Sequence, residues 1–118
     1  MKRILYIAVL VTTLCSCESH TYDELLEPEV THGPVNYTEH VKPIIDANCV
    51  SCHSAGGASS FRPLTNYEEV KEAVLTTNLL DRIQRQNGEE GQMPQTGRMP
   101  QNKIDVILQW NTDGLPEN

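Results

Sequence analysis

Apolar residues recur with helical spacing from residue 37 onward. Between residues 37 and 48 they lie three or four positions apart, which predicts an amphipathic helix. Asn36 or Thr38 can cap the start of this helix, and Pro43 lies early enough in it to be tolerated. The predicted helix runs directly into Cys49. The hydrophobic pattern therefore brings the end of a helix to a cysteine.

Three further helices are predicted downstream, and no run of alternating β-branched residues interrupts them. The second helix begins after Asn66 and the third after Asn78. The last begins at Pro100 or Asn102 and ends at Gly114, because glycine is common just past a helix end. The chain is therefore predicted to be all-α. The last helix has a broad apolar stripe made of Ile104, Val106, Ile107, Leu108 and Trp110.

Residues 1–16 have the parts of an export signal. Lys2 and Arg3 are followed by an apolar stretch, residues 4–14, that is too short to span a bilayer. The sequence Leu14-Cys15-Ser16-Cys17 then resembles a bacterial lipobox, which implies cleavage after Ser16 and lipid on Cys17. An ordinary signal peptide cut nearby, which leaves Cys17 free, is the alternative. We expect a membrane-anchored lipoprotein outside the cytoplasm, facing the periplasm or the cell surface.

Acidic residues and helix breakers dominate residues 17–35, which predicts a flexible linker between the lipidated cysteine and a folded domain at 36–118. The 118-residue chain has a formal net charge of −7. Loss of residues 1–16 removes two basic residues and no acidic one, which leaves 7 basic against 16 acidic residues, or −9. Nucleic acid is excluded as a partner because no basic stripe exists. The acidic surface keeps the protein soluble or faces a basic partner.

Residues 49–53 read Cys-Val-Ser-Cys-His, the C-x-x-C-H pattern of covalent c-type haem attachment. Two thiols at this spacing can each form a thioether with a different vinyl group on one edge of the porphyrin. The next side chain is then held beneath the ring, where an imidazole nitrogen can bind the iron. Cys49 and Cys52 are the predicted haem tethers, and His53 is the predicted proximal ligand.

These residues have two other interpretations. A disulfide or a thioredoxin-like redox pair usually accompanies a βαβ pattern, which the sequence lacks. A zinc site of Cys49, Cys52, His53 and His40 would usually include a second closely spaced ligand pair, and none is present. In the haem interpretation every thiol has a role or is removed. Cys15 leaves with the signal peptide, Cys17 carries lipid, and Cys49 and Cys52 hold the haem.

Residues 36–118 resemble the small class I cytochromes c. The resemblance consists of a helix leading into C-x-x-C-H, a Met93-Pro94 pair in a later loop, and a last helix of the I-x-x-I-x-x-W type that closes on Gly114 and Pro116-Glu117-Asn118. In that family the methionine of the Met-Pro loop is the distal iron ligand, which implies Met93. The competitor, Met99, stands where the family usually has a core leucine, so we expect Met99 to pack in the core.

The resemblance implies three to four helices around one covalent haem c with His53 and Met93 as axial ligands. Both axial positions are then filled, so we expect single-electron transfer between redox protein partners rather than enzymatic catalysis. The chain would be a carrier or a subunit of a respiratory or dehydrogenase complex.

Several alternatives remain at this stage. The first is a small peroxidase-like haem enzyme in which Met93 detaches, and the second is a haem-based sensor. A third is bis-histidine ligation through His20, His32 or His40. Arg62 is a candidate partner for a haem propionate, with an ordinary surface arginine as its alternative. Because the domain is small, the haem-free form is predicted to be poorly folded.

Overall fold

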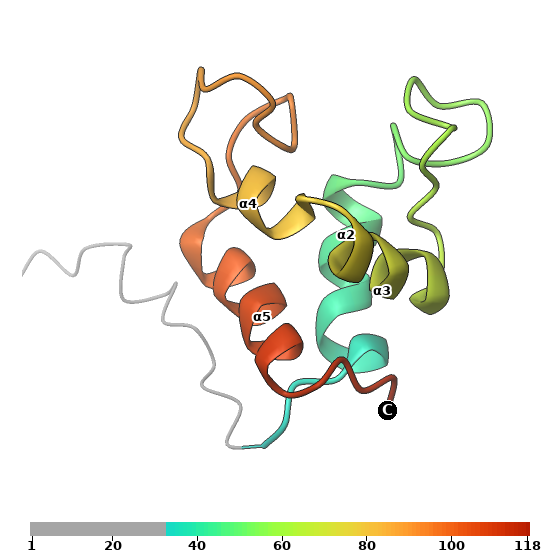
Figure 1. Cartoon of the computed structure of the whole chain (residues 1–118), viewed down its shortest axis with the longest axis vertical. Helices are drawn as coiled ribbons and strands as arrows, with labels where there is room; N and C mark the ends of the chain where they lie inside the picture. Colours follow the sequence, from blue (N-terminus) through green and yellow to red (C-terminus); the bar gives the residue numbers. More distant parts are fainter. Residues whose placement is uncertain (1–32) are drawn as a thin grey trace, which may run out of the picture.

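The computed structural model describes residues 33–118, so the predicted signal peptide, Cys17 and most of the predicted linker lie outside the described residues. Helices and loops make up this part of the chain, which contains no strand, as the all-α prediction requires (Figure 1). No helix within it is long and apolar enough to cross a bilayer. In chain order the elements are η2 (Tyr37–Val41), α2 (Lys42–Asn48), α3 (Tyr67–Thr76), α4 (Leu79–Gln84) and α5 (Gln101–Thr112).

The first predicted helix consists of two consecutive segments, η2 and α2. Asn36 caps η2, since its side chain accepts a hydrogen bond from the backbone N–H of Glu39 at 2.8 Å. The π-helical segment then changes to an α-helix, and Pro43 occupies the first turn of α2. Proline is tolerated there because its ring fixes φ at a value that suits the first turn of an α-helix. The predicted helix and its Asn36 cap are confirmed.

The other helix ends also agree with the local sequence. Asn66 caps α3 by accepting a hydrogen bond from the N–H of Glu69 at 3.0 Å. Asn78 precedes α4 without a side-chain cap bond. Gly114 follows the end of α5 with a φ of 91°, a backbone conformation that favours glycine. The expected ends of α5 are therefore confirmed.

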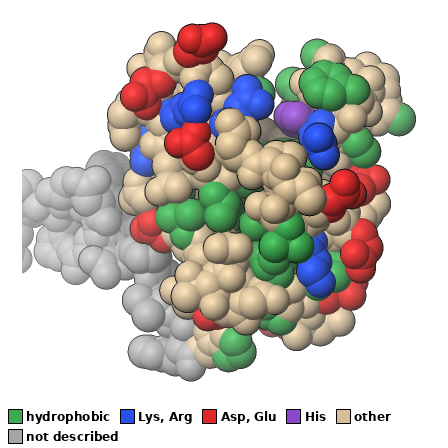
Figure 2. Space-filling model, viewed as in Figure 1, with side chains coloured by type: hydrophobic (Ala, Val, Ile, Leu, Met, Phe, Trp, Pro, Cys, Tyr) green, Lys and Arg blue, Asp and Glu red, His purple; other side chains and the backbone are tan. Residues whose placement is uncertain are grey.

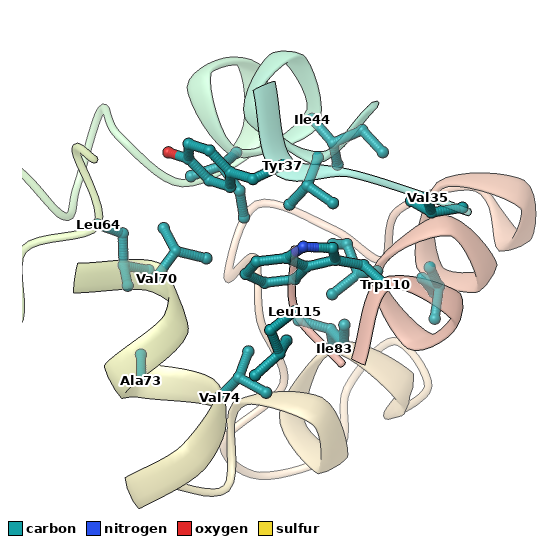
Figure 3. Packing of buried hydrophobic residues seen from close by; sticks show 14 of the residues in the cluster. Val35, Tyr37, Ile44, Leu64, Val70, Ala73, Val74, Ile83, Trp110 and Leu115 are labelled. Atoms are coloured by element: carbon teal, nitrogen blue, oxygen red, sulfur yellow. The ribbon is translucent and has the colours of Figure 1, made fainter. Parts of the chain in front are cut away.

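The indole of Trp110 lies at the centre of the core (Figure 3). Its ring centroid is 5.8 Å from that of Tyr37, so the first and last helices meet through these two rings. Tyr67 of α3 adds a third ring, 5.4 Å from Tyr37 and 6.3 Å from Trp110. The aromatic cluster thus joins three helices. The largest fully buried side chains around it are Val41, Ile45, Val70, Ile104 and Ile107.

The C-terminal tail closes against the start of the domain, where both ends of the described chain lie (Figure 1). The backbone N–H groups of Tyr37 and Thr38 donate to the carbonyls of Pro116 and Glu117, each at 2.9 Å. Val35 is 2% exposed, and its N–H donates to the carboxylate of Asp113 at 2.8 Å. Val35 is therefore part of the core, although it lies one residue before the predicted start of the folded domain.

Candidate cofactor-binding site

A cavity of about 400 Å³ opens at the end of the molecule opposite the C-terminus. Two loops, residues 54–63 and 86–99, rise on either side of it, and Figure 2 shows the hollow between them. The volume falls within the roughly 300–1,000 Å³ of typical small-molecule sites. Its wall is mostly apolar, which suits a large planar hydrophobic ligand. The apolar lining includes Ile45, Leu64, Ala73, Leu79, Ile83 and Ile107.

The cysteine-containing motif forms a turn at the end of α2. The N–H of Cys49 donates to the carbonyl of Ile45 at 2.8 Å, and the carbonyl of Cys49 accepts from the N–H groups of Cys52 and His53 at 3.1 and 2.9 Å. This turn brings Cys49 and His53 to the cavity wall, whereas Cys52 is exposed beside it. Both cysteines are free thiols, so the structure does not contain the alternative disulfide. Burial raises the pKa of the Cys49 thiol to about 11.

The imidazole of His53 is oriented by a backbone group. Its Nδ1 lies 2.7 Å from the carbonyl oxygen of Arg62. Because a carbonyl can only accept a hydrogen bond, Nδ1 carries the proton. In a neutral imidazole the other nitrogen, Nε2, then keeps its lone pair, which is the tautomer that a metal ligand needs. Sequence reasoning assigned Arg62 only a side-chain role, since no sequence signal marks a backbone acceptor.

The loop after His53 folds tightly back onto the turn formed by residues 49–53. The N–H of Ser59 donates to the carbonyl of Cys52, and the N–H of Leu64 donates to that of His53, each at 2.9 Å. A Cβ atom at Gly57 would lie only 2.3 Å from the carbonyl oxygen of Cys52, so glycine is required there. The side chain of Arg62 is exposed and borders the cavity. This location is compatible with the predicted pairing of the Arg62 side chain with a haem propionate.

The two candidate methionines occupy different environments. Met93 is half-buried and lines the cavity, and its N–H donates to the carbonyl of Arg82 in α4 at 3.0 Å. Met99 is 3% exposed within the hydrophobic core and does not line the cavity. The prediction that Met99 packs in the core is therefore confirmed. The fold brings Cys49, His53 and Met93 to the same cavity, although Met93 is remote from the motif in sequence.

The other histidine in the described chain, His40, does not line the cavity. It belongs to η2, and its Nδ1 accepts a hydrogen bond from the N–H of Asn36 at 3.2 Å. The remaining bis-histidine candidates, His20 and His32, lie outside the described residues. Residues 33–118 contain no group of three or more His, Cys, Asp or Glu side chains arranged to hold a metal ion. The zinc interpretation thus gains no support from the fold.

The cavity is also lined by polar residues that the sequence pattern did not reveal. Asn48, Thr77, Asn78 and Gln95 contribute to its wall. They come from the end of α2, from the α3–α4 connection and from the Met93 loop. Only the tertiary structure groups them, because they share no sequence motif.

No protein-family model matches the chain, and no characterised protein or solved structure shows significant similarity to it. The function must therefore be argued from the site.

Proposed function

We propose that residues 36–118 form a c-type cytochrome domain that carries single electrons. In this proposal Cys49 and Cys52 would hold one haem c covalently, and His53 and Met93 would bind its iron. The observation that carries the proposal is the sharing of one mostly apolar cavity by Cys49, His53 and Met93. The donor set fits the group, since it combines thiols at the spacing for thioether formation with a neutral imidazole and a thioether sulfur.

Each of the site residues has a defined role in this proposal. His53 presents Nε2 because the Arg62 carbonyl holds the proton on Nδ1 at 2.7 Å. Met93 supplies a neutral sulfur, and ligation by histidine and methionine raises the reduction potential of a bound haem, which then provides a one-electron couple. The apolar wall excludes water. The guanidinium of Arg62, at the cavity border, can pair with a haem carboxylate.

The order of the helices supports a class I cytochrome c fold for this domain. A helix precedes the attachment turn, a methionine loop follows α4, and a last helix carries Trp110 into the core. Asn111 departs from the aliphatic residue that the family tends to have. Its side chain is exposed, so a polar residue is accommodated at that position.

We propose further that lipid on Cys17 and the acidic linker hold this domain at a membrane surface outside the cytoplasm. The support is the pattern of residues 1–34 in the sequence. A tethered carrier would exchange electrons with redox proteins within reach of the linker, or act as a subunit of a larger complex. The net charge of −9 after signal removal favours partners with a basic surface.

The visible spectrum tests this proposal. The chain is produced with a c-type maturation system, and the oxidised and reduced spectra are recorded for wild type, Met93→Ala and the matched control Met99→Leu. We expect a low-spin c-type spectrum with the weak far-red band of methionine bound to ferric iron. Met93→Ala should lose this band, and Met99→Leu should keep it because Met99 lies in the core.

Three outcomes would contradict the proposal in different ways. A wild-type protein that retains no haem would refute the central claim. A far-red band that survives in Met93→Ala would exclude Met93 as the ligand. A high-spin wild type that turns over peroxide would favour the haem-enzyme alternative.

A further inference from the structure

The loop that carries Met93 is built around a buried amide. Gln92 is 9% exposed, and it is the one polar residue of 33–118 that is buried. Its amide oxygen accepts a hydrogen bond from the N–H of Gly88 at 3.1 Å. Its amide nitrogen donates to Oδ1 of Asn87 at 3.0 Å and to the carbonyl of Pro94 at 3.2 Å. Both amide hydrogens are therefore used.

These bonds tie distant parts of the loop together. Oδ1 of Asn87, which accepts from Gln92, also accepts from the backbone N–H of Arg98 at 2.7 Å. The start and the end of the loop thus meet at Asn87. In the chain, Met93 lies between Gln92 and Pro94, whose carbonyl accepts from the amide of Gln92. The backbone N–H of Met93 donates to the carbonyl of Arg82. The loop has no regular secondary structure, so Met93 is held by bonds such as these, together with the bond from Nε of Arg82 to the carbonyl of Gly91 at 2.7 Å.

We propose that Gln92 is a positioning residue for Met93, which keeps the methionine sulfur available to the cofactor. This inference rests on the proposed function, in which Met93 is an axial ligand. A thioether sulfur is a neutral and weak metal ligand. Whether it stays bound to the iron therefore depends on how firmly the backbone of its methionine is held. Residues that orient a metal ligand typically affect metal affinity about 10- to 100-fold. Loss of the amide would remove three hydrogen bonds within the loop and leave the N–H of Gly88 without its acceptor.

Competition by imidazole for the ferric iron measures how firmly Met93 is held. The variant Gln92→Met keeps a side chain of similar length and removes all three hydrogen bonds. We expect its apparent Kd for imidazole to fall about tenfold relative to wild type, which corresponds to about 1.4 kcal/mol. Gln86→Met is the matched control, because Gln86 belongs to the same loop and is exposed. We expect the control to match wild type.

A second pair of variants tests the same network from an exposed position. Asn87→Leu removes the oxygen that accepts from both Gln92 and Arg98, whereas Asn87→Asp keeps an acceptor at that place. We expect Asn87→Leu to lower the imidazole Kd in the same direction as Gln92→Met. We expect Asn87→Asp to retain the wild-type Kd. Asn87 is exposed, so both substitutions are compatible with folding.

Thermal unfolding of each variant separates positioning from general stability. A purely structural role would lower the unfolding temperature of Gln92→Met and Asn87→Leu and leave their imidazole Kd at 25 °C unchanged, and that result would overturn the inference. If wild type lacks the far-red methionine band, the proposed ligation fails and the inference fails with it. A wild type with the band and Gln92 variants with wild-type Kd would refute only the role of Gln92.

Discussion

Arg62 contributes to the candidate site through two different groups. Its carbonyl orients His53, and its exposed guanidinium borders the cavity. The two contributions can be separated by mutation, because a side-chain substitution leaves the carbonyl in the chain. His53 should therefore keep its orientation when the guanidinium is removed.

The prediction at the residue scale concerns Arg62→Gln in the haem-loaded protein. We expect the low-spin spectrum to remain, since the bond from His53 Nδ1 goes to the backbone. Removal of a positive charge near the haem favours its oxidised form, so the reduction potential should fall. An interaction of about 1 kcal/mol corresponds to about 40 mV for one electron. Spectroelectrochemical titration measures this change.

Lys42→Gln is the charge-matched control for Arg62→Gln. Lys42 pairs with Asp46 at 2.5 Å on the exposed side of α2 and does not line the cavity. Its removal should leave the potential near the wild-type value. Equal potentials for the Arg62 variant and wild type would show that Arg62 is an ordinary surface arginine.

At the scale of elements, α5 connects the core to the cavity. Trp110 on this helix packs against Tyr37 and Tyr67, and its Nε1 donates to the carbonyl of Pro116 at 2.8 Å. One turn earlier, Ile107 is 1% exposed and also lines the cavity. A change in Ile107 should therefore affect both the stability of the fold and the cofactor environment.

We expect Ile107→Ala to lower the free energy of unfolding of the haem-loaded protein by about 2–5 kcal/mol, because it removes buried methyl groups and enlarges the cavity. For a domain of this size each kcal/mol shifts the unfolding temperature by about 4–8 °C. Thermal unfolding followed by circular dichroism checks this value. Asn111→Ala on the exposed face of α5 should change it by less than about 0.5 kcal/mol. Similar losses in the two variants would contradict this packing.

At the scale of the whole molecule, the mostly apolar cavity leaves hydrophobic surface in contact with water, and a hydrophobic ligand would cover it. Small domains are stable by only about 5–15 kcal/mol in total. A haem that fills this space would supply a large part of the hydrophobic core.

We therefore expect the double variant Cys49→Ala, Cys52→Ala, which cannot attach haem, to be poorly folded. Circular dichroism should show much less helix than in the haem-loaded wild type. Native-like helix content in the double variant would contradict the expectation.

Alkylation of the haem-free wild-type chain at pH 8 provides a second check on the same prediction. In a poorly folded chain Cys49 and Cys52 should react at similar rates. In a folded haem-free chain, burial would raise the pKa of Cys49 to about 11, so its reactive thiolate would be scarce at pH 8. The reaction of Cys49 would then lag behind that of exposed Cys52 and accelerate as the pH rises toward 11.

The sequence alone determined where the helices lie and where several of them begin or end. Caps such as Asn36 and Asn66 and the terminal glycine Gly114 act through bonds to neighbouring residues, so local patterns reveal them. The Cys-x-x-Cys-His motif is equally local, because it consists of five consecutive residues. The burial of Met99 was also predictable, although only through the family resemblance, which places a core leucine at this position.

The tertiary structure alone decided the features that depend on contacts between distant residues. The Arg62 carbonyl reaches His53 because the intervening loop folds back, and a backbone acceptor leaves no mark in the sequence. The third aromatic ring, Tyr67, joins Tyr37 and Trp110 only when three helices meet. In the sequence, nothing distinguishes Gln92 from other loop residues. Only the structure shows that it is buried and makes three hydrogen bonds. Hydrophobic periodicity records which side of a helix is buried, whereas the partners of that side are set by packing the whole chain.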